Sequence, residues 1–201
     1  MQDTIMKQVP KGHPIFEERE ELDGLYVIHT GACKFFTLGH DDQEHIYRLL
    51  GTGEMMGKRS VITDQGAMVA ATALTDTQLC FLPKKALQEL LSQDVAFSNR
   101  FTALLVEDMN QDERLKPLFC AHRPIKARLA QLLLFIADKY GTDRDGKLDL
   151  PIKREDMAAL LGTSPEYIIH LLSRFKSFGS IALSKRNIYI LSKTKLQEVS
   201  A

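Results

Sequence analysis

The chain has 201 residues, of which 44% are hydrophobic and 26% are charged, with 26 Lys and Arg against 26 Asp and Glu. This composition is that of an ordinary soluble protein, and the chain is long enough for one large or two small domains with cores of their own. No apolar run is long enough to cross a membrane and no signal peptide is evident, so we expect a cytoplasmic protein. The three cysteines, Cys33, Cys80 and Cys120, form no CxxC pair, and we expect buried thiols.

The charge is distributed unevenly along the chain. From Pro151 to the C-terminus there are 8 Lys and Arg against 4 Asp and Glu, whereas the first 150 residues hold 18 and 22. The C-terminal part therefore carries a formal +4 and the remainder −4. A basic segment attached to an acidic one favours contact with nucleic-acid phosphates.

Residues 1–93 have the pattern of a β domain. Short runs rich in Val, Ile, Tyr, Phe and Thr alternate with Gly- and Asp-rich turns. These runs predict strands over 25–29, 32–38, 44–50, 68–73 and 78–83, followed by a short helix over 87–91. Many short strands with regular turns indicate a closed barrel or jelly roll.

Residues 94–118 contain no Gly and, before Pro117, no Pro, which predicts one long helix that we assign, with a hinge, to 94–120. An imperfect heptad repeat places six residues on one seam: Phe97, Phe101, Leu104, Asp108, Gln111 and Leu115. Such a seam is typical of a helix that pairs with a second copy, so we expect a homodimer. The alternative is that this stripe packs on the β domain of its own chain. A helix of this length can also do both, because Leu105 and Met109 offer a second apolar strip.

Residues 121–201 predict a second domain with the pattern of a winged helix-turn-helix. An amphipathic helix over 125–140 and a short strand over 148–152 precede two short helices, 154–161 and a second one beginning at Pro165. Gly162 suits the positive φ of a helix exit, and Ser164 is a good N-cap. Two strands, 181–183 and 188–191, flank a basic turn and form the wing.

The second helix of such a pair enters the major groove of DNA, so its outward residues are candidate DNA contacts. They are Ser164, Glu166, Tyr167, His170 and Arg174, and the wing tip adds Lys185 and Arg186. These side chains can hydrogen-bond base edges or phosphates. The plainer interpretation is an ordinary helical hairpin.

The order of parts, with the stretches LYVIHTGACKFF and GTGEMMGKRSVITDQGAMVAATALTDTQLCFLPKKAL and the helix-turn-helix, resembles the Crp/Fnr family of bacterial transcription regulators. The resemblance covers nearly the whole chain. It implies an α+β fold: an N-terminal β-roll (a cyclic-nucleotide-binding-like jelly roll), a long dimerisation helix and a C-terminal winged helix-turn-helix. It implies a dimer that binds double-stranded DNA, with RNA polymerase as a further partner if the protein is an activator.

The resemblance also places an effector pocket, at Gly57, Lys58, Arg59, Ser60, Met68 and Val69. Cyclic-AMP-binding members have Gly-Glu and, ten residues on, an Arg; here Lys58 stands at the Glu and Met68 at the Arg. Lys58 cannot accept from ribose hydroxyls and Met68 cannot pair with phosphate, so we do not expect cyclic AMP to bind in the family's usual way. No cofactor is expected, and an unknown small-molecule effector stays open. The Lys58–Arg59 pair indicates an anionic effector, an internal salt bridge or, as the favoured interpretation, a solvated surface pair.

The recognition helix departs from the family pattern as well. Where cyclic-AMP receptors read their site with Arg-Glu and a later Arg, this chain has Pro165, Glu166 and His170. We therefore expect an operator different from the family's usual half-site. Arg154 matches the phosphate-binding Arg that the family carries at the start of the first helix.

Two other functions fit parts of the sequence. A cupin-type metal enzyme would need converging metal ligands, and His40, Glu44 and His45 are the only local cluster. A signalling module would use its winged helix to bind a protein instead of DNA. A salt-dependent affinity for bulk DNA separates the last possibility from the regulator.

Overall fold

The computed structural model describes residues 4–40, 42–63, 65–119 and 122–200, and it describes their side chains except those of 111–119. The chain groups into two compact units, one of residues 1–37 with 47–114 and the other of 38–46 with 115–201. None of the described helices is both long and apolar enough to span a membrane. The division into 1–93, 94–120 and 121–201 stays a prediction.

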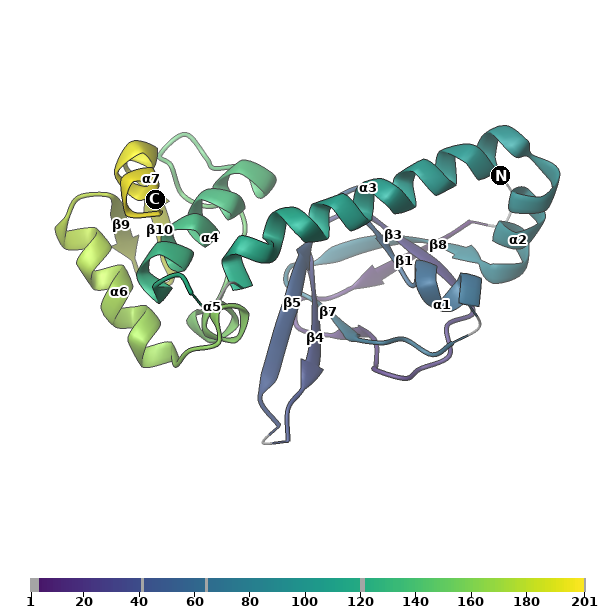
Figure 1. The fold of residues 1–201 in the computed structure, drawn as a ribbon, viewed down its shortest axis with the longest axis horizontal. Coiled ribbons are helices and arrows are strands. Elements are labelled where there is room, and N and C mark those ends of the chain that lie inside the picture. The colour runs from purple at the N-terminus through teal and green to yellow at the C-terminus, as the bar shows by residue number, and fades with distance from the viewer. Residues whose placement is uncertain (1–3, 41, 64, 120–121, 201) are drawn as a thin grey trace. The chain divides into compact units, whose positions relative to one another are not determined.

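The first unit is a β-roll of two four-stranded sheets (Figure 1). One sheet has the order β1-β8-β3-β6, with β1 Ile5–Val9, β3 Gly24–Thr30, β6 Met55–Met56 and β8 Thr77–Pro83. The other has the order β2-β7-β4-β5, with β2 Pro14–Phe16, β4 Cys33–Leu38, β5 Glu44–Leu50 and β7 Ala70–Ala73. Inward-facing residues of both sheets form one buried cluster that includes Tyr26, Ile28, Leu50, Leu79 and Phe81, which is the core expected of two packed sheets.

Three helices complete this unit: α1 Lys58–Thr63, α2 Lys84–Gln93 and residues 95–114 of α3 Val95–Phe119. Phe101 of α3 is 5% exposed and belongs to a second apolar cluster with Leu25, Val61 and Leu87. Phe97 stacks on Phe101, with ring centroids 6.1 Å apart. This face of α3 therefore packs on the roll of its own chain, which is the alternative that the sequence left open.

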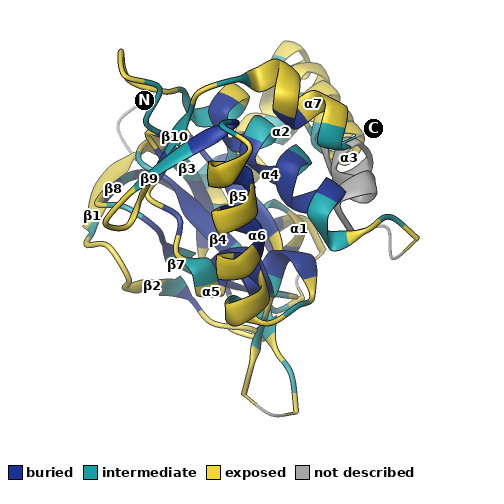
Figure 2. Ribbon diagram, turned by 90° about the vertical axis from the view of Figure 1, so that its left-hand side faces the viewer, coloured by how far each residue is buried: buried dark blue, intermediate teal, exposed yellow. Residues whose placement is uncertain are grey.

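The second unit contains a winged helix-turn-helix. Its elements are α4 Ile125–Tyr140, α5 Arg154–Leu161, α6 Pro165–Ser177, β9 Ile181–Ser184, β10 Asn187–Ile190 and α7 Lys193–Ser200. Leu133 of α4, Met157 of α5 and Phe175 of α6 are each fully buried. Figure 2 shows the outer side of α6 exposed over this buried interior.

The strand predicted over 148–152 is wrong. In this stretch of the described chain, Leu148 forms an isolated bridge with Thr142, and the neighbouring Lys147 forms one with Tyr189. Pro151 has no N–H to donate, so the segment cannot continue a regular ladder. The other predicted strands and helices are present, with shifted ends; β7 begins at Ala70, and α2 is longer than the predicted 87–91.

Candidate functional site

The turn between α5 and α6 is set by two local signals. Gly162 ends α5 with φ 60° and ψ 51°, a left-handed conformation that glycine adopts without strain. Ser164 then caps α6, because its hydroxyl accepts a hydrogen bond from the Tyr167 N–H at 3.3 Å, and Pro165 occupies the first helical position. Both signals confirm the predicted helix-turn-helix.

The inward face of α6 holds it against the core of its unit. Ile168, Leu171, Leu172 and Phe175 are each at most 1% exposed. Their spacing of three and four residues leaves the opposite face of the helix free of apolar packing. The helix is therefore fixed by one face while the other presents polar side chains.

The outer face of α6 carries Glu166, His170 and Arg174 at four-residue intervals, so they form one exposed stripe. The Tyr167 and His170 rings stack, with centroids 6.2 Å apart and planes inclined by 15°, and this contact orients both rings. The Glu166 carboxylate accepts hydrogen bonds from its own backbone N–H and from the Ser164 hydroxyl, which hold its pKa below the ordinary value. Glu166 is therefore an ionised acceptor, suited to a base amino group.

The wing is a hairpin in which Ser184 pairs with Asn187, so Lys185 and Arg186 form its two-residue tip. Both are exposed, and Lys185 has φ 53°, an unusual value for a residue with a side chain. Arg154, at the start of α5, donates from Nη1 to the backbone carbonyl of Arg186 at 2.7 Å. Partial burial lowers the pKa of Arg154, although the Glu155 charge opposes this shift.

Three further exposed residues are candidate DNA contacts, and of these only Lys176 was expected from the sequence, as a cation suited to phosphates. Ile169 is 53% exposed on α6, and an apolar side chain there is able to contact a thymine methyl. Lys153 and Lys176 are exposed cations at the start of α5 and near the end of α6. An isoleucine outside the apolar stripe of Ile168, Leu171 and Phe175 was the available signal for the first.

Replacing Ser164 with alanine is expected to destabilise the winged-helix unit by about 1 kcal/mol, because the Tyr167 N–H loses its capping acceptor. Hydrogen exchange of peptides from α6 during a urea titration measures the change. The matched control is Ser173→Ala, since the Ser173 hydroxyl bonds only to the Ile169 carbonyl within the same helix and its loss is expected to be nearly neutral. Equal effects at the two serines would contradict the capping role.

The residues of the predicted effector pocket separate into two groups. Lys58, Arg59 and Ser60 lie in α1, and Gly57 immediately precedes it. Met68, 59% exposed, and the half-buried Val69 precede β7. The Arg59 guanidinium contacts the Met68 sulfur, whereas Lys58 points to α3.

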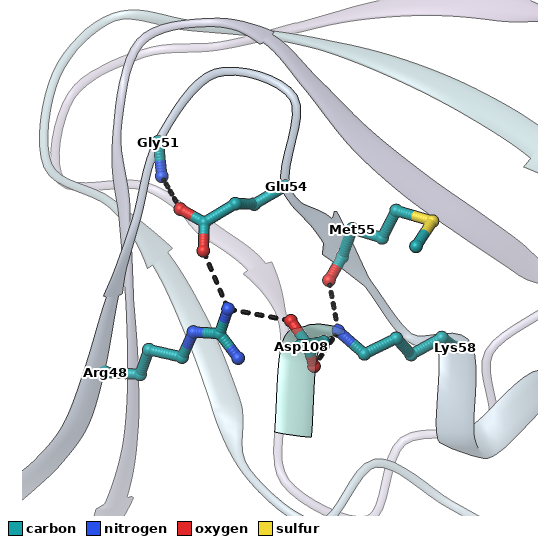
Figure 3. A network of polar contacts seen from close by, with 6 residues as sticks. All are labelled: Arg48, Gly51, Glu54, Met55, Lys58 and Asp108. Atoms are coloured by element: carbon teal, nitrogen blue, oxygen red, sulfur yellow. Dashed lines mark hydrogen bonds and ion pairs between the residues drawn. The ribbon is translucent and has the colours of Figure 1, made fainter. Parts of the chain in front are cut away.

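Lys58 belongs to an ion-pair network that joins α1, β5 and the β5–β6 turn to α3 (Figure 3). Asp108 of α3 accepts from Arg48 at 2.7 Å through Oδ1 and pairs with Lys58 at 2.5 Å through Oδ2. Arg48 also donates to Glu54 at 2.7 Å, and Glu54 accepts from the Gly51 N–H at 2.7 Å. The favoured interpretation of Lys58 as part of a solvated surface pair is thus wrong, because its ammonium forms an internal ion pair.

The network residues Arg48, Glu54, Lys58 and Asp108 have side chains that are between 6% and 17% exposed. Burial alone would raise the pKa of the Asp108 carboxyl, but hydrogen bonds and charges from Arg48 and Lys58 outweigh it and lower the pKa. Burial opposes the charge of Arg48 too, and its bonds to Asp108 and Glu54 raise its pKa nonetheless. Asp108 and Arg48 are therefore both charged near neutral pH.

The predicted dimer seam is only partly available on α3. Phe97, Phe101 and Asp108 face the roll of the same chain, whereas Leu104 is 44% exposed. The side chains of Gln111 and Leu115 lie outside the described residues. Val106 and Met109 follow Val95 by eleven and fourteen residues, about three and four helical turns, so these three exposed apolar residues share one face of α3. Phe101, six residues after Val95, lies on a different face.

The described residues contain no group of three or more His, Cys, Asp or Glu placed to hold a metal ion. Cys33 is buried, and burial raises its pKa to about 12 against a hydrogen bond from Thr77 that lowers it. Cys80 is half-buried, which is less than expected, and Cys120 lies outside the described residues.

Two family descriptions match this chain: "Cyclic nucleotide-binding domain" over residues 6–94 and "Crp-like helix-turn-helix domain" over residues 127–199. The CRP-like cAMP-activated global transcriptional regulator of Mycobacterium tuberculosis is 26% identical over 190 residues, which are 93% of this chain and 84% of that protein. The fumarate and nitrate reduction regulatory protein of Vibrio cholerae is 25% identical over 198 residues, 96% of this chain and 78% of that protein.

Solved structures show the same fold. FixK2 from Bradyrhizobium japonicum matches with a TM-score of 0.86 at 22% identity over 98% of both chains. A CRP-family transcriptional regulator from Thermus thermophilus matches with a TM-score of 0.83 at 22% identity over 96% of both chains. The chain belongs to the Crp/Fnr family of DNA-binding transcription regulators, which are not enzymes.

Proposed function

We propose that the protein is a cytoplasmic, homodimeric regulator that reads a near-palindromic operator through α6 and does not bind cyclic AMP. The observation that carries the first part is the exposed stripe of Glu166, His170 and Arg174 on a helix whose other face is fully packed. Donors and acceptors at four-residue spacing on one helix face suit the base edges of a major groove. The cations at the wing tip supply phosphate contacts beside it.

The homodimer is supported by apolar surface on α3. Val95, Val106 and Met109 are 74%, 53% and 67% exposed and share one face of the helix. A second copy of α3 would cover this face, and two recognition helices would then meet DNA about one helical turn, ~34 Å, apart. We therefore expect the two half-sites of the operator to be about one helical turn apart.

The proposal that cyclic AMP does not bind rests on Lys58 and Met68. The Lys58 ammonium is a donor that already contacts Asp108 at 2.5 Å and the Met55 carbonyl at 3.2 Å, and it offers no acceptor to ribose hydroxyls. Met68 supplies no charge for a phosphate. The Mycobacterium relative is described as cAMP-activated, so a direct test is needed. Titration calorimetry with cyclic AMP is expected to give no binding heat, and a saturable heat would overturn this part.

Recognition of a DNA sequence by α6 is tested by selecting bound duplexes from a random library with the purified, unliganded protein. Enrichment of a palindrome is expected for the wild type. The triple variant Glu166→Ala, His170→Ala, Arg174→Ala is expected to lose the enrichment while its wing keeps salt-dependent affinity for bulk DNA. Absence of both enrichment and salt-dependent affinity in the wild type would overturn the proposed function.

Val106→Glu is expected to convert the dimer to monomer, because it places a charge within the exposed apolar strip of α3. Light scattering at a fixed concentration measures the mass. Leu104→Glu is the comparison, since Leu104 belongs to the seam predicted from the heptad but lies on another face. Dissociation by Leu104→Glu alone would assign the interface to the predicted seam, and a monomeric wild type would contradict the homodimer.

A further inference from the structure

The wing and the helix-turn-helix are joined by a contact that spans 32 residues. Arg154 Nη1 donates to the Arg186 backbone carbonyl at 2.7 Å. The acceptor lies in the two-residue tip of the wing, between Ser184 and Asn187. The donor is the first residue of α5, a helix whose position is set by the buried residues Met157 and Leu161.

The two ends of the wing are held in different ways. Its base is held by backbone bonds, from the Leu148 N–H to the Ile188 carbonyl at 3.0 Å and from the Ile190 N–H to the Gly146 carbonyl at 2.8 Å. The tip has exposed side chains, and its first residue, Lys185, adopts a left-handed φ that costs free energy. The hydrogen bond from the Arg154 side chain of α5 therefore reaches the wing tip, which is the part of the hairpin where the left-handed φ of Lys185 costs free energy.

We propose that Arg154 is a positioning residue that fixes the wing tip, so that Lys185, Arg186 and its own guanidinium engage neighbouring phosphates as one unit. This inference rests on the proposed DNA binding and adds a role for Arg154 beyond a single phosphate contact. The guanidinium has five donors in a rigid plane, and the bond to Arg186 uses one of them. A lysine at this position would keep the charge but would lose the planar fork that serves the carbonyl and a phosphate together.

The inference predicts that Arg154 and the wing tip act together. Each phosphate contact contributes about 0.9 to the slope of log affinity against log salt concentration on duplex DNA. If Arg154 only contacts phosphate, Arg154→Ala lowers the slope by about 0.9 whether or not the wing cations are present. If it positions the tip, the loss is about two to three times larger with Lys185 and Arg186 present, and falls to about 0.9 in their absence.

The experiment measures this slope by fluorescence anisotropy with a random-sequence duplex. It compares the wild type, Arg154→Ala, a double variant that carries Lys185→Ala and Arg186→Ala, and a variant that combines all three of these substitutions. The double variant keeps the Arg186 carbonyl, so it removes the tip charges and leaves the positioning bond. The matched control is Lys153→Ala, which removes the same charge one residue away and is expected to cost the same in both backgrounds. An equal loss from Arg154→Ala in both backgrounds would overturn the inference while leaving DNA binding intact.

A second measurement reads the tip directly in the full chain. Order parameters from nitrogen-15 relaxation are expected to fall at the Lys185 and Arg186 amides in Arg154→Ala and in Arg154→Lys, and to stay unchanged in Lys153→Ala. Unchanged order at the tip in Arg154→Ala would also overturn the positioning role. A wild type with no salt-dependent DNA affinity would instead overturn the proposed function, and the two failures are thereby distinguished.

Discussion

Asp108→Ala is expected to lower the free energy of unfolding of the roll unit by about 3 kcal/mol, because it leaves Arg48 and Lys58 facing each other without their shared anion. Hydrogen exchange of peptides from β5 and α1 during a urea titration reports this unit separately. The adjacent Glu107→Ala is the matched control, since Glu107 is exposed and its loss is expected to stay within about 0.5 kcal/mol.

A double-mutant cycle with Lys58→Met extends this test. The combined variant Lys58→Met, Asp108→Ala is expected to recover part of the loss, because Arg48 keeps its bond to Glu54 at 2.7 Å and one uncompensated cation is gone. An Asp108→Ala protein as stable as the wild type would show that the network is solvated and contributes nothing.

The same carboxylate predicts a pH dependence of stability. The folded-state pKa of Asp108 lies below the unfolded value of about 3.9. Its stabilisation is therefore fully present above that value and is lost as pH falls through the folded-state pKa. The difference in unfolding free energy between the wild type and Asp108→Asn is expected to shrink in acid; a difference that stays constant down to about pH 2 would contradict it.

Phe175→Ala is expected to destabilise the winged-helix unit by about 3–5 kcal/mol and to abolish operator binding. Phe175 is 0% exposed, so its truncation leaves a cavity beneath the recognition helix. Exchange of peptides from α5 and α6 measures the loss, and anisotropy with the selected operator measures the binding.

Phe178→Ala is the matched control for this core substitution. Phe178 is 58% exposed at the end of the same helix, with the Lys126 ammonium 5.8 Å from its ring centroid. Losing that exposed contact is expected to cost no more than about 1 kcal/mol. Comparable losses at the two phenylalanines would show that the assigned inner face of α6 is wrong.

Local patterns determined most of what the sequence could predict. Gly162, Ser164 and Pro165 mark the turn of the helix-turn-helix, and the apolar spacing after them marks the buried face of α6. Three strands, β1 at Ile5–Val9, β2 at Pro14–Phe16 and β6 at Met55–Met56, and the six-residue helix α1 were missed. Four of the five β1 side chains are exposed, so its residues show no alternation of burial, and α1 is too short for a helical period to emerge.

Contacts between residues far apart in the chain could not be predicted from local sequence patterns. The heptad places Phe101 and Asp108 on one face of α3 correctly, but a period cannot specify which surface covers that face. The partner of Asp108 could be named only once α1, with Lys58, was placed against the roll. The Arg154–Arg186 bond joins residues 32 positions apart through a backbone carbonyl, which leaves no trace in side-chain identity.

Phe101 and Asp108 anchor α3 on the roll at two points, and together they fix both the rotation of the helix about its axis and its position along that axis. The ring is buried with Leu25 and Val61, and the carboxylate meets two cations seven residues later. A slip by one residue would turn the helix by about 100° and slide it about 1.5 Å, which breaks both anchors at once. The part of α3 up to Asp108 is therefore expected to move with the roll as one rigid body, and any bend in this helix is expected to lie C-terminal to Asp108.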